Sequence, residues 1–330
     1  MHIKRKTFAL IIIVTFLLGF VLGMVCGKMS EHAVQVPQET TASLPEIATV
    51  PEQTSEETGR LPQCTVEMID CGQADAILVM TENCAILIDA GEDRDAHDII
   101  ETLDRYGITK LDMFVCTHPH ADHIGGAQTI VEKYEIGTIL MSPTGHTSKL
   151  YKNLLETIEK KHMMIDAAKP GRSYDFDKAH FEVIAPVESY KDLNNNSVVM
   201  IMSYGDTDFL FTGDAESQAE GDFAGSLPDI EILKSGHHGS DTSSSQFLLD
   251  DIHPETAIIS CGTGNSYEHP KQETLDRYEK MGIRYYRTDL QGDIRIVTDG
   301  VDYGIITEKH ADPEIMKIGA DTAAKRSQTR

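Results

Sequence analysis

Residues 117–126 read THPHADHIGG and place three histidines and an aspartate within ten positions. A loop that only turns the chain is built from glycine, proline or asparagine, and imidazoles add nothing to it. His118 and His120 are two positions apart, so in an extended segment their side chains point the same way and can share an ion. Asp122 and His123 follow at once. Because four ligands from so short a run cannot reach one ion without strain, the stretch predicts two adjacent metal ions.

Two later stretches place further metal-binding residue types at the ends of apolar runs. Residues 209–216 read FLFTGDAE and residues 231–240 read EILKSGHHGS, while residues 68–75, MIDCGQAD, add two aspartates near the start of the folded part. Open α/β sheets form their sites at the carboxyl ends of strands, so we expect these side chains to join the histidine stretch. The residues added in this way are Asp70, Asp75, Asp214, His237 and His238.

Apolar periodicity predicts a domain of mixed strands and helices. Strands are expected over 65–70, 76–80, 84–90, 113–117, 180–185, 197–204, 208–212, 230–234, 256–260, 284–287, 293–298 and 302–306. Helical spacing is found over 95–106, 123–133, 148–161 and 270–280. Since the strands come in blocks and do not alternate strictly with helices, we expect two mixed sheets with helices outside them, a layered α/β arrangement.

The stretches HPHADH (118–123), TGD (212–214) and GHHGS (236–240) resemble the signature of the metallo-β-lactamase superfamily, HxHxDH followed by a bridging aspartate and a final histidine. The similarity is closer to the C-terminal domain of ComEC-type DNA-uptake proteins and spans nearly all of residues 64–306. A bacterial choline-phosphate esterase of cell-wall polymers has a similar GHHGS-type site. The resemblance implies a four-layer αββα sandwich of two mixed sheets with outer helices.

The resemblance also implies roles for individual residues. His118 and His120 fall on metal site 1, whereas Asp122, His123 and His237 fall on metal site 2. Asp214 would bridge the two ions, and His238 would lie beside the second ion, in contact with a phosphate or the leaving group. Asp122 and His269 form the expected catalytic group together with His238. Asp70 and Asp75 would orient ligand histidines.

Most of the superfamily has a third histidine for site 1 where this chain has NNNS, residues 194–197. An amide oxygen is a weaker and harder ligand than imidazole. If Asn194 or Asn196 takes the histidine's place, we expect site 1 to bind its ion weakly, or to prefer manganese to zinc.

Substrate contacts are expected from Lys234, Ser240 and Ser243, which lie in or beside the GHHGS stretch. The run SDTSSS, residues 240–245, has two interpretations. It could form the N-cap of a helix over 243–249, or it could present backbone N–H groups to a phosphate.

The two ends of the chain have compositions unlike the rest. Residues 1–7 are basic, and residues 8–26 run without a charge for about the length that crosses a bilayer, which predicts a single-pass anchor with the remaining chain outside the cytoplasm. A cleaved signal peptide and a secreted protein are the alternative. Residues 27–61 are rich in Glu, Thr, Pro and Gln, which predicts a disordered linker. We expect residues 62–310 to form the hydrolase domain and residues 311–330 to be a flexible tail.

The formal net charge of −24, from 29 Lys and Arg against 53 Asp and Glu, excludes a protein that coats DNA through its general surface. A nucleic-acid substrate would need a local source of positive charge, and metal ions are one. None of the six cysteines forms a CxxC pair, so buried thiols are expected in preference to zinc ligation.

Together these features predict a membrane-anchored, extracytoplasmic hydrolase with two divalent ions, zinc or manganese, which activate a water for attack. A phosphodiesterase or nuclease is the first hypothesis, with a nucleic acid or phosphodiester polymer as substrate. The alternatives are hydrolysis of phosphocholine or teichoic esters of the cell wall, of β-lactams or of lactones, and a tethered binding module without catalysis. The N-terminal helix would contact the membrane. The sequence gives no evidence for a protein partner.

Overall fold

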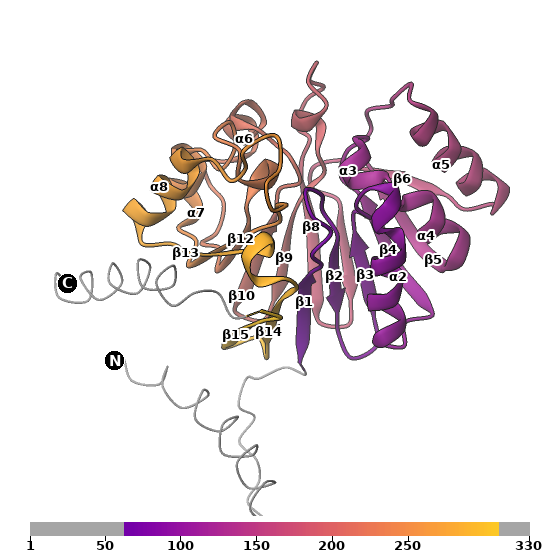
Figure 1. The fold of residues 1–330 in the computed structure, drawn as a ribbon, viewed down its shortest axis with the longest axis horizontal. Helices are drawn as coiled ribbons and strands as arrows, with labels where there is room; N and C mark the ends of the chain where they lie inside the picture. Colours follow the sequence, from indigo (N-terminus) through magenta and orange to yellow (C-terminus); the bar gives the residue numbers. More distant parts are fainter. Residues whose placement is uncertain (1–62, 310–330) are drawn as a thin grey trace, which may run out of the picture. The chain divides into compact units, whose positions relative to one another are not determined.

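The computed structural model describes residues 63–309 (Figure 1). The segments expected to be a basic end, a membrane anchor, a linker and a tail, residues 1–7, 8–26, 27–61 and 311–330, lie outside these described residues. Within residues 63–309, no helix has both the length and the apolar composition that crossing a bilayer requires.

The first sheet has eight strands in the order β15-β14-β1-β2-β3-β4-β5-β6. Strands β3 to β6 are parallel, and the other pairings are antiparallel. The bounds are Cys64–Met68 for β1, Ile77–Met80 for β2, Ala85–Ile88 for β3, Lys110–Cys116 for β4, Glu135–Met141 for β5, Ile165–Ala167 for β6, Ile294–Thr298 for β14 and Tyr303–Thr307 for β15.

The second sheet has seven strands in the order β13-β12-β11-β10-β9-β8-β7. Strands β10 to β13 are parallel, and β7 to β10 are antiparallel. The bounds are Ser173–Phe176 for β7, Ala179–Ala185 for β8, Val199–Tyr204 for β9, Thr207–Phe211 for β10, Ile232–Lys234 for β11, Thr256–Ile259 for β12 and Arg284–Arg287 for β13.

The two sheets face each other, and helices cover their outer faces (Figure 1). One apolar core lies between the sheets, with Val66 and Ile86 from the first and Met200 and Phe209 from the second. The other two cores pack α2 (Ala96–Arg105), α4 (Ala127–Lys133) and α5 (Lys149–Lys160) on the first sheet, and α6 (Ser217–Phe223), α7 (Gln246–Ile252) and α8 (Gln272–Met281) on the second. The predicted four-layer αββα sandwich is therefore confirmed.

Local sequence explains where these elements begin and end. In α2 the side chains of Ile99 and Leu103, one turn apart, face the core, and the helix is followed by Gly107 at a φ of +70°, a backbone region that glycine adopts without strain. The helix expected over 123–133 is divided into α3 (Ala121–Ile124) and α4. It divides where a Cβ on Gly126 would collide with the carbonyl oxygen of Ala90.

Among residues 63–309, five strands and α-helices have no counterpart among those predicted: β5, β6, β7, α6 and α9 (Thr288–Gln291). Only the second half of β5 is continuously apolar, β6 has three residues, and β7 is half exposed. The α6 segment, SQAEGDF, contains a glycine and few apolar residues. In these segments tertiary packing outweighs weak local signals.

The parallel parts of the sheets position the site. Strands β3 and β4 of the first sheet, and β10, β11 and β12 of the second, each continue from their carboxyl ends into a loop with a polar or ionisable residue. In two sheets that face each other, such loops meet at one end of the sandwich.

Candidate metal centre

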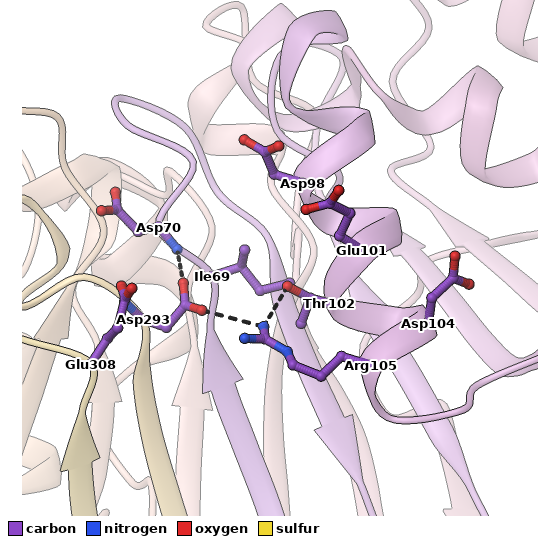
Figure 2. A pocket seen from close by; sticks show the side chains of 9 residues that line it. All are labelled: Ile69, Asp70, Asp98, Glu101, Thr102, Asp104, Arg105, Asp293 and Glu308. Atoms are coloured by element: carbon purple, nitrogen blue, oxygen red, sulfur yellow. Dashed lines mark hydrogen bonds and ion pairs between the residues drawn. The ribbon is translucent and has the colours of Figure 1, made fainter.

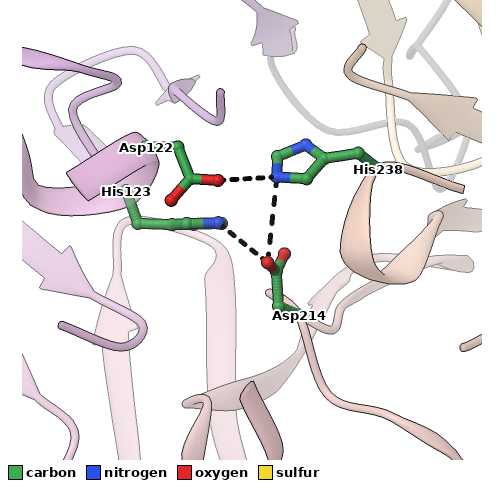
Figure 3. Close-up of side chains that lie close together, drawn as sticks. All are labelled: Asp122, His123, Asp214 and His238. Carbon is green, nitrogen blue, oxygen red and sulfur yellow. Dashed lines mark ion pairs between the residues drawn. The ribbon is translucent and has the colours of Figure 1, made fainter. Parts of the chain in front are cut away.

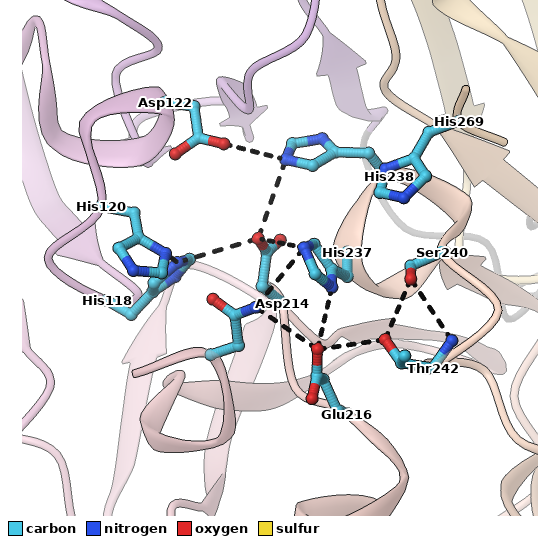
Figure 4. A network of polar contacts seen from close by, with 12 residues as sticks. His118, His120, Asp122, Asp214, Glu216, His237, His238, Ser240, Thr242 and His269 are labelled. Atoms are coloured by element: carbon cyan, nitrogen blue, oxygen red, sulfur yellow. Dashed lines mark hydrogen bonds and ion pairs between the residues drawn. The ribbon is translucent and has the colours of Figure 1, made fainter. Parts of the chain in front are cut away.

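Asp214, in the loop after β10, lies at the middle of a histidine cluster (Figure 4). Its Oδ2 atom is 3.2 Å from Nε2 of His123 and 3.7 Å from Nε2 of His118. The Nε2 atoms of His237 and His238 are each 3.8 Å from the same oxygen. A carboxylate within reach of four imidazoles is suited to bridge two cations, the role expected for this aspartate.

Asp122, His123, Asp214 and His238 form the more compact part of the centre (Figure 3). One ligand atom of each lies within 4.8 Å of the others, and Nε2 of His238 is 3.4 Å from Oδ2 of Asp122. Apart from these ion-pair contacts, the Nε2 atoms of His123 and His238 make no hydrogen bond within residues 63–309, and Oδ1 of Asp214 is buried there without a hydrogen-bond partner. Two imidazoles and two carboxylates, with atoms left for coordination, fit a divalent ion such as zinc or manganese.

The prediction that His237 is the ligand of this group and His238 its neighbour is wrong, because the structure reverses the two. Both residues have left-handed backbone conformations, with φ of 46° and 55°, so their side chains diverge. His238 is 2% exposed and reaches Asp122, whereas the side chain of His237 is 23% exposed and its Nδ1 lies 3.2 Å from Oε1 of Glu216.

This left-handed turn is strained, at a cost of about 1–3 kcal/mol for each non-glycine residue. Backbone hydrogen bonds hold it in place, from the N–H of His237 to the carbonyl oxygen of Gly213 (3.2 Å) and from the N–H of Ser240 to that of His237 (2.9 Å). Gly213 has a φ of +51°, and a Cβ there would press on Ser197 and Thr117.

His118 and His120 lie together on the other side of Asp214, as expected for site 1. Nε2 of His118 is 3.0 Å from Nδ1 of His120. Nδ1 of His118 lies 3.2 Å from Oγ1 of Thr117 and 3.3 Å from Oγ of Ser197. Burial, together with the neighbouring His123, holds the pKa of His118 well below its usual value, and a neutral imidazole is the form that binds metal.

Of the two asparagines expected at site 1, Asn194 faces the centre. Its Nδ2 lies 3.4 Å from Nε2 of His237 and 3.4 Å from Oε1 of Glu216. Its Oδ1 is buried without a hydrogen-bond partner among the described residues. This oxygen is therefore available to a cation on the side of the centre where His237 and Glu216 lie.

Asn196 does not serve that purpose, and its assignment to site 1 is wrong. Its Oδ1 accepts hydrogen bonds from the N–H of Tyr190 (3.1 Å) and from Oγ1 of Thr144 (2.8 Å). Its Nδ2 donates to the carbonyl oxygens of Tyr190 and Asp192. All of its hydrogen-bonding capacity is used to fix the loop before β9.

Asp89, directly after β3, is a residue of the site that sequence reasoning missed. Its Oδ2 lies 2.8 Å from Nδ1 of His123, and the carboxylate accepts hydrogen bonds from N–H and Oγ1 of Thr117. Burial alone would lower the pKa of His123, but Asp214 and Asp89 outweigh it and raise this pKa well above its usual value. The available signal was an aspartate at the end of an apolar run, CAILIDA.

Lys234 and Asp75 form a buried ion pair of 2.8 Å beneath the centre. The Lys234 side chain is 1% exposed, so its predicted contact with substrate is wrong: the ammonium neutralises Asp75. Although burial would raise the pKa of Asp75, Lys234 and His238 keep it below its usual value. The N–H of Asp75 also donates to the carbonyl oxygen of Asp122. Its carboxylate lies 3.8 Å from Nδ1 of His238 and 4.0 Å from Nδ1 of His123, so the hydrogen bond expected to orient a ligand histidine is not formed.

Asp70 was predicted to orient a ligand histidine, and this is wrong. Its backbone N–H donates to Oδ1 of Asp293 at 2.8 Å, and its side chain lines a separate acidic pocket (Figure 2). This pocket has a volume of about 540 Å³, and its ionisable lining residues are Asp70, Asp98, Glu101, Asp104, Arg105, Asp293 and Glu308. A histidine is not among its lining residues, so Asp70 has no ligand to orient.

Ser240 lies at the edge of the centre (Figure 4). Its Oγ is 2.9 Å from Oγ1 of Thr242, which in turn donates to Oε1 of Glu216 at 3.0 Å. Because Glu216 also lies beside His237, this chain of contacts links Ser240 to the ligand loop, and a substrate contact by Ser240 stays a prediction.

Ser243 is fully buried, so it cannot contact a substrate in this conformation, contrary to the prediction. Nor is it the helix cap, because Ser245 caps α7 by accepting from the N–H of Leu248. The N–H groups of Ser244 and Ser245 donate to the carboxylate of Glu220. They are therefore not available to a phosphate, which contradicts the second interpretation of this run, whereas Ser245 confirms the N-cap interpretation, with the helix over 246–252 and not 243–249.

His269 lies beside the centre, as expected. Its ring centroid is 5.4 Å from that of His237, and its Nδ1 is 3.4 Å from Nε2 of Gln73. Burial, with the nearby imidazoles of His237 and His238, lowers the pKa of His269 to about 4. Its ring is therefore neutral at pH 7.

The model of the metallo-beta-lactamase superfamily matches residues 69–263, a range that contains the whole ligand set. The chain belongs to the metallo-β-lactamase superfamily. Its fold is accordingly that of the superfamily's metal-dependent hydrolases, and its histidine and aspartate clusters are candidate metal sites.

Two curated relatives confirm the resemblance of this superfamily member to competence proteins. ComE operon protein 3 of Bacillus subtilis (strain 168) is 30% identical over 252 residues, which cover 70% of this chain and 32% of that protein. Competence protein ComA of Neisseria gonorrhoeae is 31% identical over 236 residues, with 70% and 32% covered. The chain thus spans about a third of the length of these relatives.

Among solved structures, the metallo-β-lactamase fold protein YhfI from Bacillus subtilis aligns with a TM-score of 0.44 and 14% identity. The alignment covers 68% of this chain and 96% of that one.

Proposed function

We propose that this superfamily member is a metal-dependent phosphodiesterase that cleaves nucleic acid outside the cytoplasm. In this proposal residues 8–26 anchor it in the membrane and two divalent ions, zinc or manganese, are its cofactors. The observation that carries the proposal is the position of Asp214 Oδ2, 3.2–3.8 Å from four imidazoles. The similarity to competence protein ComA, together with the resemblance to ComEC-type DNA-uptake proteins, supports nucleic acid as the substrate class.

Electrostatics also favours chemistry at the centre itself. The net charge of −24 repels a polyanion, and the lysine expected to contact substrate, Lys234, is already paired with Asp75. Attraction for a phosphodiester must therefore come from bound cations. Two ions bound beside each other would supply it locally, without a basic surface.

The ligand residues divide between two ions. Asp122, His123 and His238 would hold one and His118 and His120 the other, with Asp214 between them. When bound, such ions lower the pKa of a water to about 7 and neutralise charge that develops on the phosphoryl oxygens. The remaining chemistry belongs to the surrounding side chains.

Those side chains fix the ligands and face the substrate. Asp89 binds Nδ1 of His123 and thereby directs its Nε2 toward Asp214. His238 is held by its Nδ1, 3.0 Å from the carbonyl oxygen of Ser260. His237 is more exposed than His118, His123 or His238, so it is placed to contact a phosphate oxygen or the leaving group, the role that the sequence suggested for His238.

The test is cleavage of a labelled single-stranded oligonucleotide by the full-length chain in mild detergent. The metal-free protein, the protein with manganese and the protein with zinc are compared, with Asp214→Asn as the inactive control. We expect metal-dependent cleavage that the variant loses. Metal-loaded protein that leaves the oligonucleotide intact, or a variant as active as the wild type, would refute the proposal.

A second candidate is hydrolysis of a smaller substrate: a phosphocholine or teichoic ester, a β-lactam or a lactone. The strongly acidic composition favours it, since a neutral or zwitterionic molecule meets no repulsion. Cleavage of nitrocefin or p-nitrophenylphosphorylcholine without oligonucleotide cleavage would establish it. Protein that binds no transition metal would favour the tethered binding module.

A further inference from the structure

The loop between β12 and α8 presents an exposed tyrosine beside the metal centre. Tyr267 is 62% exposed, more than any other tyrosine or phenylalanine among residues 63–309. Its ring stacks on that of His269, with centroids 5.7 Å apart and an angle of 28° between the planes. Since one face lies against His269, the exposure of the side chain leaves the opposite face open to solvent.

The stacked pair is connected to the ligand cluster. The His269 centroid is 5.4 Å from that of His237, and Nε2 of His237 is 3.8 Å from Oδ2 of Asp214. Three rings thus lead from the solvent to the bridging carboxylate.

Hydrogen bonds hold this loop in its conformation. Oδ1 of Asn265 accepts from the N–H of His269 at 3.0 Å, and its Nδ2 donates to the carbonyl oxygens of His269 and Gly262. Oε1 of Gln73, from the loop after β1, accepts from the N–H of Gly262 at 3.0 Å. A ring held in place before binding loses little conformational freedom when a ligand stacks on it.

An open aromatic face suits a flat ring system. Stacking of a base on an aromatic side chain contributes to binding without sequence preference, because every base has a flat π-face. In a duplex each base already stacks between its neighbours, so a single strand gains more. A quaternary ammonium is recognised by several ring faces around the cation, whereas the ring contact of Tyr267 within residues 63–309 is with His269 alone.

We propose that Tyr267, supported by His269, stacks on a base of a single-stranded nucleic acid and so positions the neighbouring phosphodiester at the metal centre. This assignment rests on the proposed phosphodiesterase function and specifies its substrate. Tyr267 is a positioning residue in this role, because it holds the substrate and takes no part in bond cleavage.

The experiment compares wild-type chain, Tyr267→Ala and Tyr267→Phe on three manganese-dependent reactions. The substrates are a single-stranded oligonucleotide, an oligonucleotide of the same length with abasic residues, and the duplex. For Tyr267→Ala we expect KM for the base-bearing single strand to rise about tenfold with kcat unchanged. Tyr267→Phe should retain the wild-type KM, because it keeps the ring.

Two controls separate stacking from a structural effect. Phe247→Ala removes another exposed aromatic, 53% exposed and on helix α7, and should leave KM unchanged. The abasic substrate should show the same KM with Tyr267→Ala as with the wild type.

Each remaining outcome has a defined meaning. An unchanged KM for the base-bearing strand, or an equal rise for base-bearing and abasic strands, overturns the role of Tyr267 while the phosphodiesterase function stands. If the wild type cleaves no oligonucleotide, both proposals fail. If only p-nitrophenylphosphorylcholine turnover depends on Tyr267, the ring recognises a cation and the inference is wrong.

Discussion

The two halves of the candidate metal centre lie on either side of the Asp214 carboxylate in our proposal, and they differ in how firmly their side chains are held. In the first half, Asp122, His123 and His238, both histidines have a fixed partner at Nδ1, Asp89 and the carbonyl oxygen of Ser260, and both are at most 2% exposed. In the second half, His118 and His120, the Nδ1 partners of His118 are hydroxyl groups at 3.2 and 3.3 Å. Asn194, whose Oδ1 has no hydrogen-bond partner among the described residues, lies beside His237 and Glu216.

The difference indicates that the two positions bind their ions with different affinity and metal preference. A ligand set fixed by carboxylate and carbonyl partners binds its ion tightly, because little reorganisation accompanies binding. The half with hydroxyl partners and an amide oxygen should hold its ion more weakly and favour a harder metal such as manganese. The predictions below would each remove or enlarge this asymmetry.

Asp214→Asn should have the largest effect, since it weakens both halves together. We expect hydrolysis to fall by roughly a thousandfold or more, because a ligand shared by two ions contributes several kcal/mol to the reaction. The metal content measured by mass spectrometry should fall below one ion per chain. Asp122→Asn is the matched control and should remove only the ion of the first half; equal metal loss in both variants would contradict the shared role.

Lys234→Met should have the second largest effect, which is a lower free energy of unfolding. The pair with Asp75 is buried, with side chains 1% and 2% exposed, and loss of one partner leaves an uncompensated charge at a cost of about 3–5 kcal/mol. Urea denaturation of the metal-free protein measures this loss of stability. Lys234→Met combined with Asp75→Asn should recover much of the loss, and a double variant less stable than the single one would contradict this account.

Asp89→Asn should weaken the first half selectively. His123 loses the carboxylate that holds its Nδ1, and loss of such a partner typically costs 10- to 100-fold in metal affinity. Metal titration by calorimetry should show the tighter dissociation constant rising and the weaker one unchanged. Asp293→Asn, in the separate acidic pocket, is the control and should alter neither.

Asn194→His should have the smallest effect, and unlike the other substitutions it should strengthen metal binding. A nitrogen ligand in place of the amide should lower the weaker dissociation constant for zinc by about tenfold and reduce the asymmetry. Asn194→Ala should raise the same constant. If neither variant changes zinc binding, Asn194 does not face an ion.

The sequence was sufficient for the layers and for the prediction that most of the candidate ligands lie close together. Apolar runs that end in Asp or His predict strands whose carboxyl ends meet, and His118, His120, Asp122, His123 and Asp214 all lie where that reasoning placed them. A strand-end ligand depends on local sequence and on sheet geometry, both of which a pattern of residues contains.

The assignments that failed depend on tertiary structure. Which of His237 and His238 reaches Asp122 depends on the left-handed backbone of both residues. The sequence does not predict this conformation, because neither position is a glycine. Lys234 is buried because Asp75, from a distant loop, neutralises it. Asp89 and Asp70 both follow apolar runs, and packing alone decides that one binds His123 while the other lines a different pocket.

The most direct test of the asymmetric two-ion centre is anomalous diffraction from crystals of the protein grown with manganese or zinc. The account predicts two peaks on either side of Asp214, the stronger one among Asp122, His123 and His238 and the weaker one beside His118, His120 and Asn194. A single peak, a reversed order of occupancy, or a peak bound by His237 in place of His238 would contradict it.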